Sequence, residues 1–185
     1  MTALYRFDPA QGRFTVQAFA TGMLSMLGHS PTFAVRDYAG TVRLDGDRLE
    51  GLSVALTIRV DSLDLLDRVS ASDRAEILGR MQREVLETAA FPEVAFHTVE
   101  TESEPLDRGH YRTFLGGRLT LHGATGRQGI DAELLVFTDG LRLRGGGTVR
   151  MSAYGIKAVT ALGGAIRLKD ELRFSFDLAA IPEGP

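Results

Sequence analysis

The sequence contains no cysteine, and this absence excludes several kinds of site at once. Without a thiol, the chain has no disulfide, no thiolate metal ligand and no cysteine nucleophile. Lysine is almost as rare, because Lys157 and Lys169 are the only two. Arginine therefore carries nearly all the positive charge, and its alternate positions along strand-like segments are typical of a solvated face.

Long apolar runs are also missing. No segment approaches the roughly 20 apolar residues of a membrane-spanning helix, so we expect no stable membrane insertion. The N-terminal segment MTALYRFDPAQGRF contains Asp8 and no apolar signal-peptide core. We therefore expect a cytoplasmic protein, or a periplasmic one if this N-terminus is a processed end. The net charge of −3 also argues against nucleic acid as a partner.

The length and composition predict one globular unit. The 185 residues, 44% of them hydrophobic, are enough to bury a single core, and no shift in composition marks a boundary. We therefore expect residues 1–185 to form a single domain. The sequence leaves a homodimer open.

Apolar residues alternate with polar ones along most of the chain, which predicts half-buried β-strands. The clearest segments are residues 52–60, 110–122 and 172–178, and weaker ones precede and separate them. Asp139-Gly140 lies between two such segments and predicts a hairpin of type I′, because both residues tolerate positive φ. The pattern predicts seven to nine antiparallel strands arranged mostly as a meander.

One segment has helical periodicity instead, at about residues 73–89. Its apolar positions, spaced as on one face of a helix, are Ile77, Leu78, Met81, Val85 and Leu86. Asp73 and Glu76 have the spacing of a capping box. We expect one amphipathic helix that packs over a sheet face or closes one end of a barrel.

Glycines interrupt several strand-like segments, notably at 116–117 and 145–147. Glycine within a strand marks bulges and tight bends, which a long meander needs in order to close on itself. We therefore expect an all-β fold in the form of a closed antiparallel barrel of about eight strands, in preference to a sandwich.

Four segments, in order, resemble the YceI-like family of lipocalin-like, polyisoprenoid-binding proteins. They are YRFDPAQGRFTVQAFA near the N-terminus, ETAAFPEVAFHTVE at residues 87–100, GGRLTLHGATGRQGIDAEL at 116–134 and RMSAYGIK at 150–157. The resemblance covers about residues 5–179. It implies an eight-stranded antiparallel barrel with a helix near one end and a long apolar interior that holds an isoprenoid chain. The stretch LGHSPTF departs from the family pattern.

The function that we expect is non-enzymatic: the barrel binds an isoprenoid or similar long-chain lipid, such as a polyprenyl or quinone tail, as a carrier or sequestering protein. The bound lipid is the only cofactor or partner that we expect. Two alternatives stay open, namely a small barrel enzyme acting on a lipid-like substrate, and a solid-core stress-response or interaction module. The four histidines show no spacing of metal ligands, so no metal is expected.

The candidate ligand-binding residues combine a polar group at the barrel mouth with apolar side chains inside. His29 is a candidate contact for a polar head group, a histidine satisfied by backbone at a turn before Pro31, or the acid/base of the enzyme alternative. Arg150 matches the family's arginine and is a second candidate for a head group. The other candidates are Met23, Leu27, Phe33, Leu56, Ile58, Met81, Phe96, Leu119, Leu121, Tyr154, Phe174 and Phe176. Flexible Met and flat Phe side chains suit a tunnel for an apolar chain, although they also fill solid cores.

Overall fold

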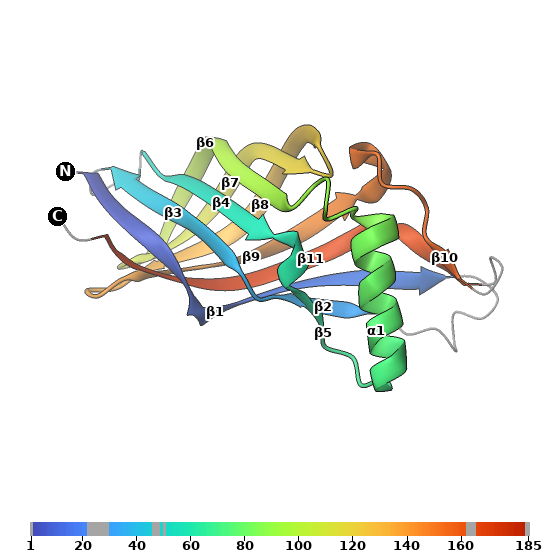
Figure 1. Cartoon of the computed structure of the whole chain (residues 1–185). Helices are drawn as coiled ribbons and strands as arrows, with labels where there is room; N and C mark the ends of the chain where they lie inside the picture. Colours follow the sequence, from blue (N-terminus) through green and yellow to red (C-terminus); the bar gives the residue numbers. More distant parts are fainter. Residues whose placement is uncertain (1, 22–29, 46–48, 50, 162–165, 184–185) are drawn as a thin grey trace.

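The computed structural model describes residues 2–21, 30–45, 49, 51–161 and 166–183. These residues form one antiparallel sheet that closes into a barrel (Figure 1). The eight strands of the barrel are β1 (Thr2–Thr21), β3 (Tyr38–Asp45), β4 (Ser53–Arg59), β6 (Glu93–Asp107), β7 (His110–Leu121), β8 (Ala124–Val136), β9 (Leu141–Arg150) and β11 (Ile166–Pro182). The predicted all-β barrel of about eight strands is confirmed.

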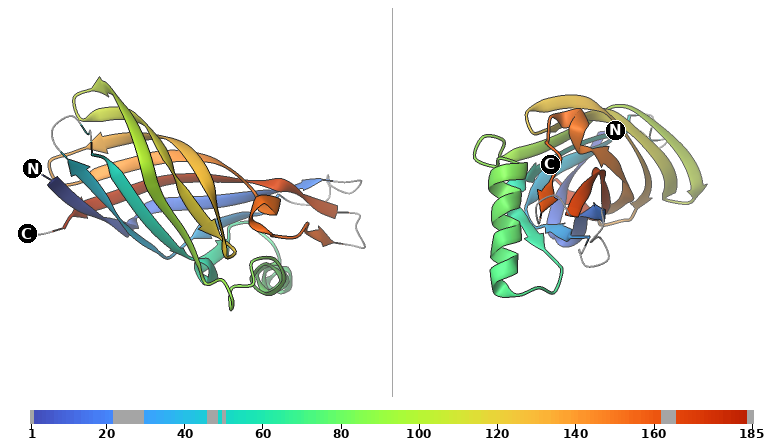
Figure 2. Two further views of the ribbon diagram at one scale, coloured as in Figure 1. Left: turned by 90° about the horizontal axis from the view of Figure 1, so that it is seen from above. Right: turned by 90° about the vertical axis from the view of Figure 1, so that its right-hand side faces the viewer.

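The barrel closes because its first and last strands pair with each other. β1 and β11 run antiparallel from Tyr5↔Pro182 to Thr21↔Arg167, with shifts of register on the way. The end-on view in Figure 2 shows the resulting ring of strands. This pairing joins the first and last strands of the sheet, although the β8–β9 ladder ends at Asp131↔Gly146 and the β4–β6 ladder ends at Ala55↔His97.

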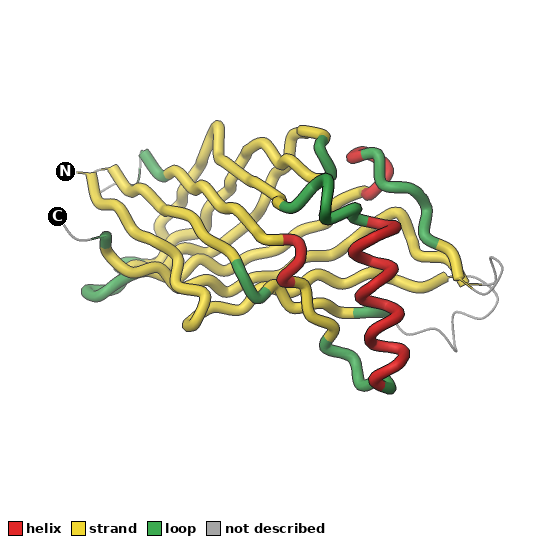
Figure 3. Tube along the Cα trace, viewed as in Figure 1, coloured by secondary structure: helices red, strands yellow, loops and turns green. Residues whose placement is uncertain are grey.

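Three short strands extend the sheet outside the ring. β2 (Thr32–Val35) pairs with the second half of β1, β5 (Leu63–Leu65) pairs with β2, and β10 (Thr160–Ala161) pairs with β11. The first half of β1 pairs with β3 instead, so β1 changes its neighbour along its length. Both termini lie at one end of the barrel, and the helix and the short strands lie toward the other end (Figures 1 and 3).

The helical segment is shorter and begins earlier than predicted. α1 (Ala71–Arg80) continues directly into one π-helical stretch, η2 (Met81–Val85). The expected capping box at Asp73 and Glu76 is wrong, because Ser70 is the N-cap and its hydroxyl accepts a hydrogen bond from the Asp73 N–H. Two short 3-10 turns, η1 (Val60–Ser62) and η3 (Met151–Tyr154), follow β4 and β9.

The hairpins show where turn residues were predicted well and where they were missed. Asp139-Gly140 does connect β8 to β9, and the Phe137 N–H donates to the Gly140 carbonyl at 2.8 Å. The prediction of a type I′ turn is wrong, because Asp139 and Gly140 do not have positive φ. His122 and Gly123 have φ of 50° and 75° and form the tight two-residue turn between β7 and β8, which the sequence did not signal.

Candidate functional site

A cavity of about 150 Å³ lies inside the barrel, in the half nearer α1. Every lining residue except Gln128 is apolar. The walls come from β1, β2, β4, β6, β7, β8, β9 and β11, and Val60, Leu63 and Leu86 contribute from η1, β5 and the end of the helical segment. An apolar cavity of this kind stays dry and favours an apolar ligand.

Seven of the candidate residues lie around this cavity. They occupy inward positions on four strands, and they are Leu56, Ile58, Phe96, Leu119, Leu121, Phe174 and Phe176. The strand periodicity places them there, because every second side chain of a barrel strand points inward. The same alternation brings Phe14, Val149 and Leu172 to the cavity, although the sequence analysis did not select them.

Glycines opposite phenylalanines shape one wall. Phe174 and Phe176 of β11 lie in register with Gly147 and Gly145 of β9. A Cβ atom on either glycine would come within 2.9 Å of the facing ring, so only glycine leaves the rings their space. The two rings stack with centroids 6.4 Å apart and planes 6° from parallel. These glycines therefore make room for the phenylalanine rings of the cavity wall. The sequence analysis had interpreted them only as sites of strand bends.

Two other candidates, Phe33 and Met81, lie in a separate small core. They pack with Leu65 between β2, β5 and the helical segment, and neither lines the cavity. Their apolar character was read correctly from the sequence, but their position depends on the short β2–β5 ribbon. The structure thus brings them next to the cavity half of the barrel without bringing them to the cavity itself.

Arg150 and Tyr154 also lie away from the cavity lining. Arg150 is exposed at the end of β9. Tyr154 belongs to η3 and is buried, with its hydroxyl close to the backbone of Gly126 on β8. Burial raises the pKa of Tyr154 above its ordinary value. The remaining candidates, Met23, Leu27 and His29, lie outside the described residues.

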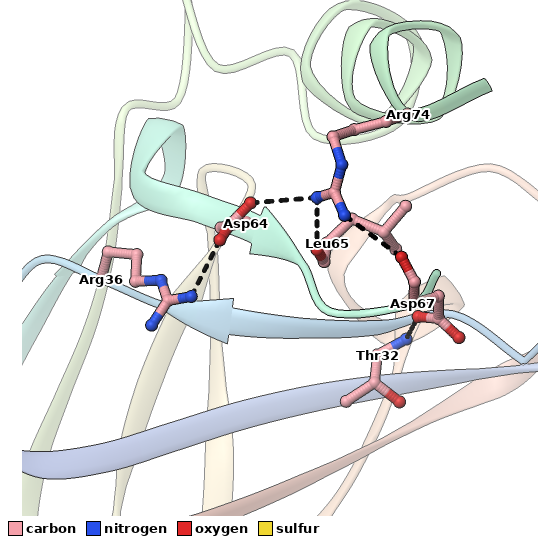
Figure 4. Close-up of polar contacts among 6 residues, drawn as sticks. All are labelled: Thr32, Arg36, Asp64, Leu65, Asp67 and Arg74. Atoms are coloured by element: carbon pink, nitrogen blue, oxygen red, sulfur yellow. Dashed lines mark hydrogen bonds and ion pairs between the residues drawn. The ribbon is translucent and has the colours of Figure 1, made fainter. Parts of the chain in front are cut away.

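Arg74 anchors α1 to the short strands beside the cavity (Figure 4). Its guanidinium donates to the carboxylate of Asp64 and to the backbone carbonyls of Leu65 and Asp67. Asp64 also pairs with Arg36 at 2.9 Å, and the Asp67 carboxylate accepts from the Thr32 N–H at 2.8 Å. One arginine on the helix therefore binds β5 and the loop after it, and the Asp67 carboxylate of that loop in turn binds β2. The sequence showed the clustered aspartates but not this function.

A second contact joins the end of the helical segment to the β7–β8 turn. His122 Nε2 and Glu87 Oε2 lie 2.8 Å apart, and the ring of Phe91 packs on the His122 ring at 4.4 Å. Both His122 and Glu87 have positive φ, a conformation that costs free energy for residues with side chains. The neighbours of these two residues, Leu121 and Leu86, both line the cavity. The contact thus fixes two parts of the cavity wall relative to each other.

The charged groups of the other half of the barrel lie outside the core. Asp177 accepts hydrogen bonds from Arg142 at 2.8 Å and Arg144 at 3.1 Å. Burial alone would raise the pKa of Asp177, but these bonds and charges outweigh it and hold the pKa below its usual range. Beneath them, the Tyr38 hydroxyl is buried without a hydrogen-bond partner among the described residues. Burial, aided by the charge of Asp8, raises the pKa of Tyr38.

The described part of the chain shows neither a metal-binding cluster nor a membrane-spanning helix. Within it, no three His, Asp or Glu side chains gather as ligands of a metal ion would. None of its helices has the length and apolar character needed to cross a membrane.

Comparison with known proteins agrees with this architecture. A profile of the YceI-like domain matches residues 5–180, nearly the whole chain. The chain belongs to the YceI-like family. The resemblance read from the four sequence segments is therefore confirmed. No curated protein matches the chain.

Solved structures of YceI-like and related proteins share the fold at low sequence identity. The BcnA protein of Burkholderia cenocepacia aligns with a TM-score of 0.70 and 16% identity over 94% of this chain and 98% of its own. A polyisoprenoid binding domain from Saccharophagus degradans, implicated in plant cell wall breakdown, aligns with a TM-score of 0.67 and 12% identity, over 99% and 100%. The YCEI protein of Campylobacter jejuni aligns with a TM-score of 0.60 and 14% identity, over 82% and 84%. These similarities show the common fold.

Proposed function

We propose that this YceI-like barrel binds the apolar chain of an isoprenoid or similar lipid in its cavity, as a carrier or sequestering protein. The observation that carries the proposal is a cavity whose lining is apolar except for Gln128. The domain from Saccharophagus degradans, which has the same fold, is described as polyisoprenoid-binding, and this supports the choice of ligand class.

Burial of the chain would supply the binding free energy. Each methylene transferred from water into an apolar site contributes about 0.8 kcal/mol. A ligand with several buried carbons therefore binds without a strong polar contact. The rings of Phe14, Phe174 and Phe176, whose centroids lie 5.8–6.4 Å from one another, form an aromatic cluster against which a branched chain can pack.

The cavity volume limits how much of the chain fits inside. An apolar cavity of about 150 Å³ is known to hold a molecule the size of benzene. The present cavity has a similar volume, so it holds about one or two isoprene units with the side chains as they stand. The remainder of a longer chain would leave the barrel near Leu63 and Leu86 or would require side chains to move.

The cavity lining favours binding over catalysis. None of its side chains can donate or accept a proton at neutral pH, because Gln128 is its only polar residue. General acid–base chemistry needs such a group within hydrogen-bond reach of the substrate. The enzyme alternative would depend on His29, which lies outside the described residues.

Calorimetric titration with prenols of 5, 10, 15 and 20 carbons tests the proposal. The affinity should rise steeply up to about 10 carbons, as each added group is buried, and then level off as the chain leaves the filled cavity. The heat capacity change should be negative, the mark of apolar burial. Absence of binding at every chain length, or an affinity independent of length, would contradict the proposal.

A further inference from the structure

Two paired strands continue past the cavity at the end of the barrel beside α1. Leu172 of β11 lines the cavity, and it is in register with Ala18 of β1. Beyond this pair the two strands run on to Thr21↔Arg167, where β10 joins β11. Figures 1 and 2 show this end of β1 and β11 reaching beyond the other barrel strands. We call residues 17–21 and 167–173 the β1–β11 ribbon.

The ribbon and the adjoining segment from β9 to β10 concentrate positive charge. Their sequence, residues 148–161 and 167–173, contains five cations and two carboxylates, which gives a net charge of +3. The whole chain carries −3, so the remaining residues carry −6. The five cations, which include both lysines of the chain, are all exposed, and they are Arg150, Lys157, Arg167, Lys169 and Arg173.

The two carboxylates of this region are balanced locally. Asp170 accepts hydrogen bonds from the N–H and the hydroxyl of Ser152, and these bonds, aided by the charge of Arg150, hold the pKa of Asp170 below its usual range. Glu171 is in register with Arg150 on β9. The other four cations take part in no ion pair within the described ranges of the chain. Their charge is therefore available to a partner.

Two of these four cations flank an aromatic ring on the outer face of the ribbon. The Lys169 Nζ lies 5.9 Å and the Arg173 guanidinium carbon 5.2 Å from the centroid of the Phe19 ring. Arg173 points outward, because both its neighbours on β11, Leu172 and Phe174, line the cavity. An aromatic ring between two cations is a combination suited to the surface of a bilayer, where the cations meet lipid phosphates.

The distribution of charge decides which end of the barrel can face such a surface. Basic residues near an anionic bilayer are attracted to it, and each of them adds to the binding. The rest of the molecule, with its net negative charge, is repelled, so the field of the bilayer turns the ribbon end toward it. Lys169 and the cavity residue Leu172 are three positions apart on β11, roughly 10 Å along a strand. Docking through the ribbon thus brings the cavity close to the lipid.

We propose that the β1–β11 ribbon is a docking surface for an anionic lipid bilayer, and that the barrel exchanges its apolar ligand with the bilayer while it is docked. Arg167, Lys169 and Arg173 contact the phosphates of the lipid headgroups, and Phe19 packs between them. The exchange of ligand rests on the proposed function, whereas the docking itself does not.

Vesicle flotation tests the docking. Wild-type protein should bind phosphatidylglycerol vesicles at least about tenfold more tightly than phosphatidylcholine vesicles. The difference should shrink as salt is added, because salt screens exposed charges. The double variant Lys169→Glu with Arg173→Glu should lose most of this preference.

The matched control reverses two arginines near the termini, at the other end of the barrel. Arg6 on β1 and Arg43 on β3 are exposed, and neither forms an ion pair in the part of the chain that the structure describes. Arg6→Glu with Arg43→Glu changes the net charge by the same amount and should keep the preference for phosphatidylglycerol. Equal losses in the two double variants, or no loss in either, would overturn the docking surface.

Titration with geraniol in the absence of vesicles separates this inference from the proposed function. Lys169→Glu with Arg173→Glu should bind geraniol as the wild type does, since neither residue lines the cavity, and this result also shows that the variant is folded. Lys169→Gln with Arg173→Gln repeats the comparison if the reversal of charge prevents folding. If geraniol binds and the vesicles do not, the docking is wrong and the cavity proposal stands. If the vesicles bind and no prenol does, the docking stands and the exchange of ligand fails with the proposed function.

A soluble polyanion excludes a different class of partner. Poly-glutamate should compete weakly with phosphatidylglycerol vesicles, because it offers carboxylates without a lipid surface for Phe19. If poly-glutamate binds as tightly as the vesicles and the Lys169→Glu, Arg173→Glu variant loses both, the ribbon recognises an acidic protein and the proposal of a bilayer is wrong.

Discussion

The two halves of the barrel have the same strands but different interiors. In the half that carries the termini, Val42, Leu134 and Leu141 are at most 2% exposed, and they line neither the apolar cavity nor the open, partly polar pocket at that end of the barrel. We call this the solid half. In the half beside α1, side chains of similar kind surround an empty space of about 150 Å³, and we call this the hollow half. Hydrophobicity is therefore not what distinguishes them.

The difference follows from strand pairing and residue size. The ring of Tyr38 packs edge-on against Phe7 and Phe14, two residues that line the cavity, and so occupies interior space beside it. In the hollow half β8 and β9 separate, and β1 pairs with β2 in place of β3. The cavity thus lies where β1 exchanges β3 for β2 and where the β8–β9 ladder has ended.

Shortening a leucine should affect stability most in the solid half. Leu134 is fully buried, so Leu134→Ala should lower the free energy of unfolding by about 2–5 kcal/mol, from lost burial and from the void that remains. Leu119→Ala, the matched change in the hollow half, should cost less, because its side chain already borders empty space. Urea denaturation of both variants measures the difference. Equal losses would mean that the two halves are packed alike.

Enlarging a leucine should mainly reduce stability in the solid half and mainly weaken ligand binding in the hollow half. Leu141→Trp overfills the solid half and should cost about 1–3 kcal/mol of stability. Leu121→Trp fills the cavity, so it should cost less stability and weaken prenol binding at least tenfold. The same urea series, combined with calorimetric titration, checks both effects. Unchanged prenol affinity in a well-folded Leu121→Trp variant would count against the cavity as the binding site.

Tyr38 offers a finer test within the solid half. Its hydroxyl has no partner among the described residues, so Tyr38→Phe should raise stability by about 1 kcal/mol. Burial raises the pKa of Tyr38 above 10, so the folded state keeps the proton that the unfolded state loses as the pH rises past 10. Wild-type stability should therefore fall above about pH 10, and less steeply in Tyr38→Phe. A variant less stable than the wild type at pH 7 would show that the hydroxyl is satisfied.

The contact between His122 and Glu87 should have the smallest effect on stability. The Glu87 side chain is half exposed, so Glu87→Gln should cost no more than about 1 kcal/mol. Because Leu86 and Leu121 adjoin the contact, the variant should release bound prenol faster than the wild type does. Stopped-flow displacement measures that rate, and Glu84→Gln, whose partner Arg80 lies on the same helical segment, is the control. Equal release rates would exclude a role for the contact at the cavity.

Local sequence patterns predicted the elements better than the site. Period-two alternation predicted the strands and seven of the cavity residues, because the inward face of a strand is a local property. The end of the β8–β9 ladder at Asp131↔Gly146 could not be predicted, since register between strands is a tertiary property. Phe33 and Met81 were assigned to the ligand because an apolar side chain in sequence does not reveal which of two neighbouring cores it joins. The turn at His122-Gly123 was missed because residues other than glycine seldom adopt positive φ, so His-Gly is not read as a turn of this kind.

The central claim is that an apolar chain lies in the hollow half of the barrel and nowhere else. Methyl NMR of the protein titrated with geraniol tests it most directly, because the cavity is lined with Leu, Ile and Val. The methyl signals of Ile58, Leu119 and Leu121 should shift, and those of Val42, Leu134 and Leu141 should stay unchanged. Shifts confined to the solid half or to surface residues, or no shift at saturating geraniol, would contradict the account.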